Sequence, residues 1–422
     1  MSFSVSKKSG NRKNKVLVAG YIGGINVGDE AIALTVAASL KEDHNCDVTI
    51  ASGQPELSQK YMQYDVSFVE TFYPGKLLDS KALFELIKVI KNTDILLFAG
   101  GGLLQDVHST KLLEHGAFLC SIAKVFNKKV VAIGVGAGPI KSELGKQFAN
   151  TFMRFNDVVY FRDEYSRNYI ENTLHIESGT SRTALDSILL IKINKILKAK
   201  SKNKIGLCIR DWPGLPFNNI SLLLKKLIDL EYKIVFIPYE KSDILLFGKL
   251  HEMFGNNIVL AKDESFESTL ETIGSLHFLI SMRLHANLFS ALLKTPFVAL
   301  AYDNKLRTVF SSIGYENNVF DLDFPFNDVF EKVTNSSNTS MSNLDDLTEI
   351  QHKALDAVLN DSTVEIKKMD LHLKVAAFLF WMNRLVFKPT LVRISMKVSP
   401  FLKPIVPSII EKKIKKMLGI DW

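Results

Sequence analysis

The chain has 422 residues, 47 % of them hydrophobic and 23 % charged, and its net charge at pH 7 is +7. This is an ordinary globular composition, in a chain long enough for two domains. Its three cysteines, Cys46, Cys120 and Cys208, lie far apart without a CxxC pair, which excludes a disulfide scaffold or a zinc ribbon and fits a reducing cytoplasm.

Both ends of the chain are basic. Residues 1–14 are polar and contain no apolar stretch, so we expect a disordered N-terminus without a secretory signal peptide. Residues 367–422 contain twelve lysines and arginines against three acidic residues, which leaves the rest of the chain close to neutral. The longest uninterrupted apolar run, at 375–382, is far shorter than the ~20 residues that a membrane span needs.

From residue 15 onward, apolar segments typical of buried strands alternate with helical segments. The predicted strands of the first half lie at 15–21, 47–52, 94–100, 129–136, 157–163 and 182–187, with helices at 29–42 and 83–92 among the intervening segments. Continuous apolar strands separated by helices predict a parallel sheet covered on both faces. The lysine-rich segment 189–204 interrupts the alternation and marks a domain boundary.

The alternation then restarts, with predicted strands at 204–211, 233–240, 257–262, 277–285 and 296–302. We therefore predict an α/β protein of two Rossmann-like doubly wound domains, with a cleft between their strand carboxyl ends. The predicted divisions are two domains at 15–190 and 204–330, a polar loop and helix at 331–364, and a basic amphipathic tail at 365–422.

Two glycine-rich turns follow predicted strands. In GYIGGINVGDEAI (20–32), backbone N–H groups can approach an anion at a helix N-terminus, but a tight turn with Asp29 as the N-cap explains the pattern equally well. In FAGGGLLQDVHS (98–109), three consecutive glycines favour a backbone laid against a ligand, with Gln105 and Asp106 beside it, over a loop with an aspartate cap. In GVGAGP (134–139), Pro139 argues against a dinucleotide site.

Three arginines stand at the carboxyl ends of predicted strands. Arg162 either faces the cleft or is a surface charge beside an Asp163 helix cap, and Arg210 repeats the arrangement in the second domain. Within 277–285, side chains alternate along the strand, so Arg283 and His285 should share one face about 6.5 Å apart, close enough to contact one anion. The alternative is a buried Arg283 paired with a carboxylate beside a structural His285.

In this order, the motifs resemble the polysaccharide pyruvyl transferase family over roughly residues 15–325. The matching segments are GYIGGINVGDEAI, AGGGLLQD, GVGAGP, VYFRDEYS, ALDS, CIRDW, SMRLHANLFSAL and PFVALAYDNK. The resemblance implies a GT-B-like arrangement, with the acceptor on the N-terminal domain and the donor on the C-terminal domain. It also implies transfer of pyruvate from phosphoenolpyruvate onto two hydroxyls of one sugar, as a ketal, in a lipid-linked bacterial surface glycan.

The same resemblance implies that Arg162, Arg283 and His285 bind the donor and catalyse its reaction. Guanidinium groups suit the carboxylate and phosphate of phosphoenolpyruvate, and an imidazole suits general acid catalysis near neutral pH. Asp106 is the candidate base. The further substrate contacts that we expect are Asn26, Asp29, Gly100, Gly101, Gly102, Gln105, Arg210 and Lys305. Since no side-chain cluster has metal-ligand spacing, we expect neither a metal nor a cofactor, and activity that survives EDTA.

In the tail, basic residues are interleaved with apolar ones, which favours an anionic membrane surface over nucleic acid. We therefore expect a cytoplasmic protein attached peripherally to the inner face of the plasma membrane. The alternative is that 371–387 packs as a buried helix against the first domain. Two other functions stay open, a GT-B glycosyltransferase using a nucleotide sugar and a non-catalytic partner-binding protein, as does the oligomeric state, including a homo-oligomer.

Overall fold

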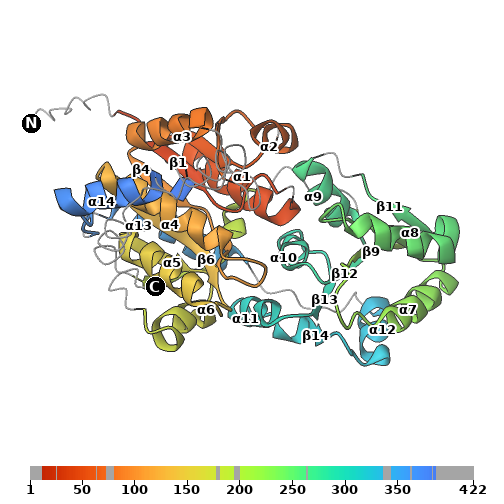
Figure 1. Cartoon of the computed structure of the whole chain (residues 1–422). Coiled ribbons are helices and arrows are strands. Elements are labelled where there is room, and N and C mark those ends of the chain that lie inside the picture. Colours follow the sequence, from red (N-terminus) through yellow and green to blue (C-terminus); the bar gives the residue numbers. More distant parts are fainter. Residues whose placement is uncertain are drawn as a thin grey trace, which may run out of the picture.

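Two parallel β-sheets, each flanked by helices, lie side by side in the structure (Figure 1). It is a computed structural model that describes residues 12–24, 26–62, 64–72, 80–176, 181–193, 200–262, 265–335, 344–361, 364–382 and 384–385. The predicted disordered N-terminus lies outside these residues up to residue 11, and the tail lies outside them from residue 386 onward.

The first sheet has the described strand order β3-β2-β1-β4-β6-β7-β8, with β5 paired to β6. Its strands are β1 (Lys15–Ala19), β2 (Asp47–Ser52), β3 (Ser67–Glu70), β4 (Ile95–Phe98), β5 (Gly101–Leu104), β6 (Lys129–Ala137), β7 (Val158–Phe161) and β8 (Ser181–Thr183). Its helices are α1 (Val27–Glu42), α2 (Pro55–Met62), α3 (Ser80–Asn92), α4 (Lys111–Val125), α5 (Glu143–Phe155) and α6 (Glu164–Asn168), followed by the π-helix η1 (Tyr169–Thr173) and the 3-10 helix η2 (Ser187–Leu190).

The second sheet has the described strand order β11-β10-β9-β12-β13-β14. Its strands are β9 (Lys204–Cys208), β10 (Lys233–Phe236), β11 (Ile258–Leu260), β12 (Phe278–Ser281), β13 (Phe297–Ala301) and β14 (Val319–Asp321). Its helices are α7 (Phe217–Asp229), α8 (Asp243–Phe254), α9 (Phe266–Ser275), α10 (Leu284–Leu292), α11 (Asn304–Ser312) and α12 (Phe326–Thr334), with 3-10 turns η3 (Gly255–Asn257) and η4 (Glu316–Asn318).

Both strand orders reverse direction at a single point, which is the doubly wound topology that the sequence predicts. The reversal falls between β1 and β4 in the first sheet and between β9 and β12 in the second. Ligands of open α/β sheets bind beyond the strand carboxyl ends at such points. The loops after these four strands are therefore the expected walls of a site.

Helix α1 belongs to the first domain and packs against both domains. It is apolar nearly all round, with Ala31, Ala33 and Ala37 fully buried, which is typical of a helix surrounded by protein. It packs on β1 and β2 of its own sheet and also on α9 and α10 of the second domain. The N-terminus of α1 is thereby held in the region between the domains (Figure 1).

The C-terminal helices return to the first domain. Helix α13 (Asp345–Asn360) packs on β6 and η2, and α14 (Leu371–Met382) packs on α4 (Figure 1). Trp381 of α14 is 1 % exposed, and its ring lies 5.4 Å from that of Phe118 and 6.2 Å from that of Phe148. The packed helix that the sequence left as an alternative is therefore the arrangement of 371–382, so residue 365 is too early a start for the tail.

The outer face of α14 is apolar and exposed. Leu371, Val375 and Leu379, spaced one turn apart, are 73 %, 50 % and 47 % exposed. None of the helices in the described ranges has both the length and the hydrophobicity that crossing a bilayer requires.

Candidate active site

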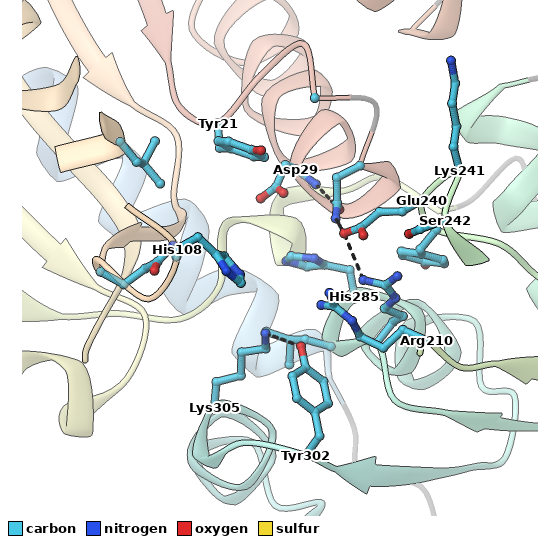
Figure 2. Close-up of a pocket in the computed structure, with 18 of the residues that line it drawn as sticks. Tyr21, Asp29, His108, Arg210, Glu240, Lys241, Ser242, His285, Tyr302 and Lys305 are labelled. Atoms are coloured by element: carbon cyan, nitrogen blue, oxygen red, sulfur yellow. Dashed lines mark hydrogen bonds and ion pairs between the residues drawn. The ribbon is translucent and has the colours of Figure 1, made fainter. Parts of the chain in front are cut away.

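A cavity of about 530 Å³ lies between the domains, beyond the carboxyl ends of their strands (Figure 2). Its described lining residues include five cationic side chains and two carboxylates. The cations are Arg162, Arg210, Lys241, Arg283 and Lys305, and the carboxylates are Asp29 and Glu240. The excess of positive charge at a domain boundary makes this cavity suited to an anionic ligand.

Nine residues predicted from the sequence line this cavity: Asn26, Asp29, Gly102, Gln105, Arg162, Arg210, Arg283, His285 and Lys305. Three other predicted residues, Gly100, Gly101 and Asp106, do not line it. The loops after β1, β9 and β12 thus converge as their places at the reversal points require, while β5 and the loop after it contribute Gly102 and Gln105.

The three consecutive glycines divide into two roles. Gly100 and Gly101 have φ angles of +107° and +80°, a backbone conformation that strains other residues. A Cβ on Gly100 would lie 2.8 Å from the carbonyl oxygen of Gly134, so these glycines shape the turn rather than contact a ligand. Gly102 is exposed and has no neighbour within 4 Å of its Cβ direction, which leaves its backbone open to the cavity.

Asp106 holds a loop together, which argues against the predicted role as a base. It accepts hydrogen bonds from the backbone N–H groups of Lys141 and Ser142, both at 2.8 Å, and from the Ser142 hydroxyl at 2.6 Å. Partial burial raises the pKa of Asp106, but these hydrogen bonds outweigh it and lower the pKa below its ordinary value. A carboxylate with its lone pairs engaged outside the cavity is poorly placed to take a proton there.

Asp29 is the carboxylate that faces the cavity from the first domain. The N-cap of α1 is Asn26, whose side chain accepts from the N–H groups of Gly28 and Asp29, so the alternative of Asp29 as the cap is wrong. Burial raises the pKa of Asp29 from 3.8 to about 6, although His285 and Lys305 oppose this shift. Asp29 therefore titrates close to neutral pH at the edge of the cavity.

His285 enters the cavity from a helix rather than from a strand. Strand β12 ends at Ser281 and α10 begins at Leu284, so the strand alternation that was expected to place His285 does not extend to it. A Cβ on Gly28 of α1 would lie 2.0 Å from His285 Nδ1. The imidazole of the second domain therefore fits against the first domain only because residue 28 is a glycine.

Asp186 is the acidic neighbour of His285. Its Oδ2 lies 3.7 Å from His285 Nε2 and 3.9 Å from Arg162 Nη1, and its side chain is 1 % exposed. Burial alone would raise the pKa of Asp186, but His285 and Arg162 hold it below the ordinary value. Among the described residues, neither Asp186 Oδ2 nor His285 Nε2 has a hydrogen-bond partner, although the two atoms face each other across the domain boundary.

Arg162 is buried at the cavity wall and is not the surface charge that the sequence left as an alternative. Its side chain is 7 % exposed and its Nε donates to Asp163, which also caps α6 as expected. A Cβ on Gly136 would lie 2.5 Å from the guanidinium carbon, so the glycine of β6 makes room for this side chain.

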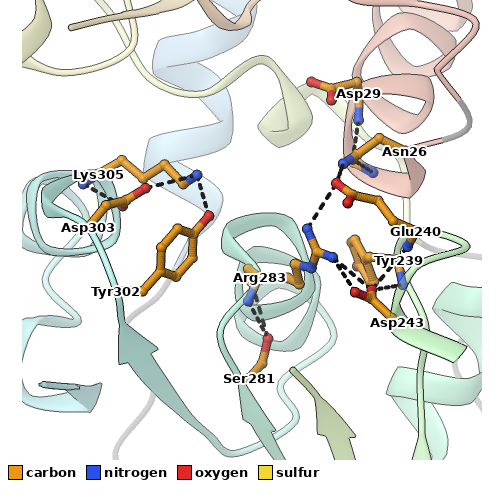
Figure 3. A network of polar contacts seen from close by, with 11 residues as sticks. Asn26, Asp29, Tyr239, Glu240, Asp243, Ser281, Arg283, Tyr302, Asp303 and Lys305 are labelled. Atoms are coloured by element: carbon orange, nitrogen blue, oxygen red, sulfur yellow. Dashed lines mark hydrogen bonds and ion pairs between the residues drawn. The ribbon is translucent and has the colours of Figure 1, made fainter. Parts of the chain in front are cut away.

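Arg283 is bound by carboxylates of its own domain (Figure 3). Its Nη2 donates to both carboxylate oxygens of Asp243 at 2.7 Å, and its Nη1 donates to Glu240 at 3.1 Å. Glu240 in turn accepts from the Asn26 side chain at 2.9 Å, which joins the two domains. The alternative of a buried Arg283 paired with carboxylates is thus the arrangement in the structure.

Arg210 has different surroundings, because aromatic rings hold it. Its guanidinium carbon lies 5.0 Å from the ring centroid of Trp212 and 5.7 Å from that of Tyr302. Within the described residues it forms no ion pair with a carboxylate, and its Nε has no hydrogen-bond partner. The cationic group of Arg210 is therefore positioned by aromatic rings, with Glu240 as an electrostatic neighbour rather than an ion-pair partner (Figure 2).

Lys305 stands at the start of α11 on the opposite wall. Its Nζ donates to the Tyr302 hydroxyl at 2.6 Å and lies 3.1 Å from Asp303 (Figure 3). Tyr302 thus contacts both Arg210 and Lys305 and fixes the spacing of two cations.

Sequence reasoning missed several residues of the site. Asp186 lies in ALDS after β8, and its position at a strand end was a usable signal. His108 is exposed in the loop after β5, and Figure 2 shows its imidazole turned toward the cavity that His285 enters. The other missed residues are Tyr302, Glu240 and Asp243. Glu240 and Tyr302 also end predicted strands and carried the same signal, whereas Asp243 did not.

No group of three or more His, Cys, Asp or Glu side chains in the described part of the chain is arranged to hold a metal ion. Metal independence of the activity stays a prediction, which treatment with EDTA tests.

Comparison with known proteins gives one family and one fold. The family model described as polysaccharide pyruvyl transferase matches residues 26–304, well over half of the chain. Among solved structures, UDP-N-acetylglucosamine 2-epimerase from Rickettsia bellii aligns with a TM-score of 0.58 at 14 % identity, covering 89 % of this chain and 100 % of that chain.

Two further solved structures have the same arrangement. A glycosyltransferase from Rickettsia africae has a TM-score of 0.51 at 14 % identity, over 90 % of this chain and 100 % of its own. UDP-GlcNAc 2-epimerase from Neisseria meningitidis, bound to UDP-GlcNAc, has a TM-score of 0.54 at 13 % identity, over 82 % of this chain and 100 % of its own. At these identities the likeness establishes the fold alone, and the predicted GT-B-like pair of Rossmann-like domains is confirmed.

Proposed function

The chain belongs to the polysaccharide pyruvyl transferase family, and from that premise we propose that it transfers pyruvate from phosphoenolpyruvate onto two hydroxyls of one sugar, as a ketal. The sugar belongs to a surface glycan in its lipid-linked form. The observation that carries this proposal is the cavity between the domains, where cationic side chains of both domains surround a nearly buried imidazole.

The donor fits the cations of the cavity. Phosphoenolpyruvate carries a carboxylate and a phosphate, and planar guanidinium groups bind both with paired hydrogen bonds. Arg162 and Arg210 supply such groups from the two domains, and Lys305 adds a point charge beside Arg210. These three side chains hold the donor and stabilise the charge on the departing phosphate.

The proton balance of the transfer requires an acid and a base. The methylene carbon of phosphoenolpyruvate gains one proton, and the two sugar hydroxyls lose two as their oxygens bond to C2. The C2–O bond to phosphate breaks, and the second proton leaves with inorganic phosphate. The cavity must therefore deliver a proton to the donor carbon and accept one from the acceptor.

His285 is the acid in this proposal. It is nearly buried, faces the cavity, and its Nε2 lies 3.7 Å from the carboxylate of Asp186. Asp29 is the cavity carboxylate whose pKa is raised to about 6 by burial, and it accepts the proton of the attacking hydroxyl. This replaces Asp106 as the base.

Arg283 acts through other residues. Its guanidinium is occupied by Asp243 and Glu240, so its contribution is to fix the loop after β10 and the start of α10, from which His285 projects. We assign it a positioning role.

The alternative donor is a nucleotide sugar, since two of the solved structures with this fold are UDP-GlcNAc 2-epimerases. The two donors are separated by measuring thermal stability of the full chain with phosphoenolpyruvate and with UDP-GlcNAc. Stabilisation by phosphoenolpyruvate, followed by phosphate release and a pyruvate ketal in the mass spectrum of a lipid-linked glycan, supports the transferase. Stabilisation by UDP-GlcNAc alone contradicts it.

A peripheral membrane attachment accompanies this function. Residues 386–422 contain eight lysines and arginines against two acidic residues, interleaved with apolar side chains. They follow α14, whose exposed stripe of Leu371, Val375 and Leu379 adds apolar surface. An anionic bilayer accepts both kinds of group, with about 1 kcal/mol for each basic residue near the surface.

Truncation after Leu385 tests the attachment, because it keeps the buried Trp381 in place. The truncated protein should bind phosphoenolpyruvate normally and fail to sediment with vesicles of phosphatidylglycerol, while the full chain sediments and is released only in part by high salt. Equal sedimentation of both proteins rules out an anchor in residues 386–422.

A further inference from the structure

A second cavity, of about 330 Å³, adjoins the cationic one. The two cavities share seven lining residues, so a molecule in one meets a molecule in the other across them. The shared residues are Gly102, Gln105, His108, Arg162, Arg210, Tyr302 and Lys305. Its size falls within the range of about 300–1,000 Å³ that is usual for small-molecule sites.

The walls that belong to the second cavity alone differ from those of the first. Pro139 and Tyr165 come from the first domain, and Trp212 comes from the second. Tyr165 is 47 % exposed, with its ring stacked on Tyr169 at a centroid distance of 6.4 Å, and Trp212 is half-buried. Aromatic rings from the two domains thus line one small space.

Polar groups accompany these rings. Tyr302, which the two cavities share, packs against Trp212 with centroids 4.7 Å apart, and Asn304 and Thr308 of α11 line the same cavity. Aromatic faces with a few hydrogen-bonding groups suit a molecule that has both C–H faces and hydroxyls. Arg162, Arg210 and Lys305 line both cavities, whereas Tyr165 and Trp212 line the second alone.

We propose that this second cavity is the acceptor subsite, and that a neutral pyranose ring lies in it against Tyr165 and Trp212. The inference rests on the proposed function. The C–H face of a pyranose packs on aromatic rings, while its hydroxyl edge points across Gly102 and Arg162 toward the donor cavity. The acceptor therefore contacts the first domain, which the family resemblance implies as the acceptor side, and also Trp212 of the second.

The geometry explains how two hydroxyls of one sugar react with one carbon. A ring held flat against aromatic side chains presents neighbouring hydroxyls from one edge, so both reach C2 of the donor without the ring leaving its subsite. Arg162 lines both cavities and stands where the two substrates meet.

The test measures binding of methyl glycosides of glucose, galactose, mannose and N-acetylglucosamine to the full chain, by saturation-transfer NMR and titration. We expect at least one to bind in the millimolar range and to weaken roughly tenfold in both Tyr165→Ala and Trp212→Ala. Tyr165→Ala should leave phosphoenolpyruvate affinity unchanged, because Tyr165 lines only the second cavity. Phe84→Ala on α3 is the matched control, as Phe84 is 58 % exposed and lines neither cavity.

Absence of glycoside binding to the wild-type protein, or equal binding in both folded variants, overturns the subsite. Phosphoenolpyruvate binding in the same samples separates this result from failure of the proposed function. A protein that binds glycosides through Tyr165 but ignores phosphoenolpyruvate keeps the subsite and loses the donor. A protein that binds phosphoenolpyruvate but no glycoside keeps the donor and loses the subsite.

Discussion

Arg210 and Arg283 occupy equivalent places at the ends of adjacent strands, β9 and β12, yet their surroundings differ completely. Arg283 is bound on two sides by Asp243 and Glu240, which neutralise it. Arg210 is held by the rings of Trp212 and Tyr302, which orient a cation without neutralising it. A buried ion pair makes the first arginine a structural element, while the aromatic cradle keeps the second available to an anionic ligand.

The carboxylates that bind Arg283 come from beyond β10, which pairs with β9 and not with β12. The loop after β10 supplies Glu240 and Asp243, and the latter also accepts the N–H groups of Tyr239 and Glu240, at 2.9 and 3.1 Å. The loop is therefore folded around the carboxylate that binds Arg283. Arg283 is thus engaged by two carboxylates of its own domain, whereas Arg210 contacts aromatic rings.

The largest expected effect concerns His285, which like Arg283 follows β12. His285→Ala should lower turnover by roughly 10²–10⁴-fold, because the proton for the donor carbon loses its source. The affinity for phosphoenolpyruvate should stay unchanged, because Arg162, Arg210 and Lys305 are still present. Phosphate release and calorimetry measure the two quantities, with His251→Ala on α8 as the control outside the cavity. Near wild-type turnover in His285→Ala would exclude His285 from the chemistry.

Replacing the carboxylate of Asp243 tests whether its ion pair with Arg283 stabilises the fold. Asp243→Asn leaves the buried Arg283 without its closest charge partner, so the free energy of unfolding should fall by about 3–5 kcal/mol. Denaturant titration followed by tryptophan fluorescence measures this loss. Glu240→Gln, at a more exposed carboxylate, should cost less. Equal stability of Asp243→Asn and the wild-type protein would mean that the pair contributes little to the fold.

Three arginines give the next effect: Arg162, Arg210 and Arg283. Arg210→Lys and Arg162→Lys keep the charge but lose the planar fork, so the dissociation constant for phosphoenolpyruvate should rise roughly 10–100-fold. Arg283→Lys should change it only a few-fold, because its guanidinium already binds protein carboxylates. Calorimetry measures the dissociation constant for phosphoenolpyruvate in the three variants. The reverse order of effects would break the comparison between the β9 and β12 ends.

Local patterns predicted most of the fold. The long apolar strands and their alternation with helices were predictable from the sequence, because buried parallel strands are continuous apolar runs. The missed strands β3, β5 and β14 are short, at three or four residues, and contain polar residues or glycines. Such segments are strands through tertiary pairing and not through their own sequence.

The site was predictable in position but not in connectivity. Strand-end arginines and glycine turns marked the cleft, since doubly wound topology fixes where strand ends lie. The partner of Arg283 is 40 residues away in the chain, and Asp186 meets His285 across the domain boundary. Asp106 looked available because its partners in the loop before α5 lie 35 and 36 residues away. Which charges neutralise one another is a property of packing that spacing does not contain.

The smallest expected effect extends the comparison to carboxylates, since Asp243 is paired with an arginine while Asp29 is not. Burial raises the pKa of Asp29 to about 6, so the folded protein favours its neutral form. Relative to Asp29→Asn, the wild-type protein should therefore lose stability as pH rises from about 4 through 6. Below pH 4 the two proteins should melt alike, and above pH 6 the variant should melt a few degrees higher, with the helix N-terminus at α1 limiting the gain. The same variant should lose turnover at pH 7.5 for want of a base. If the melting temperatures of the two proteins differ by the same amount at pH 4 and pH 7.5, Asp29 is an ordinary surface carboxylate. Full turnover of Asp29→Asn would mean that another group of the cavity is the base.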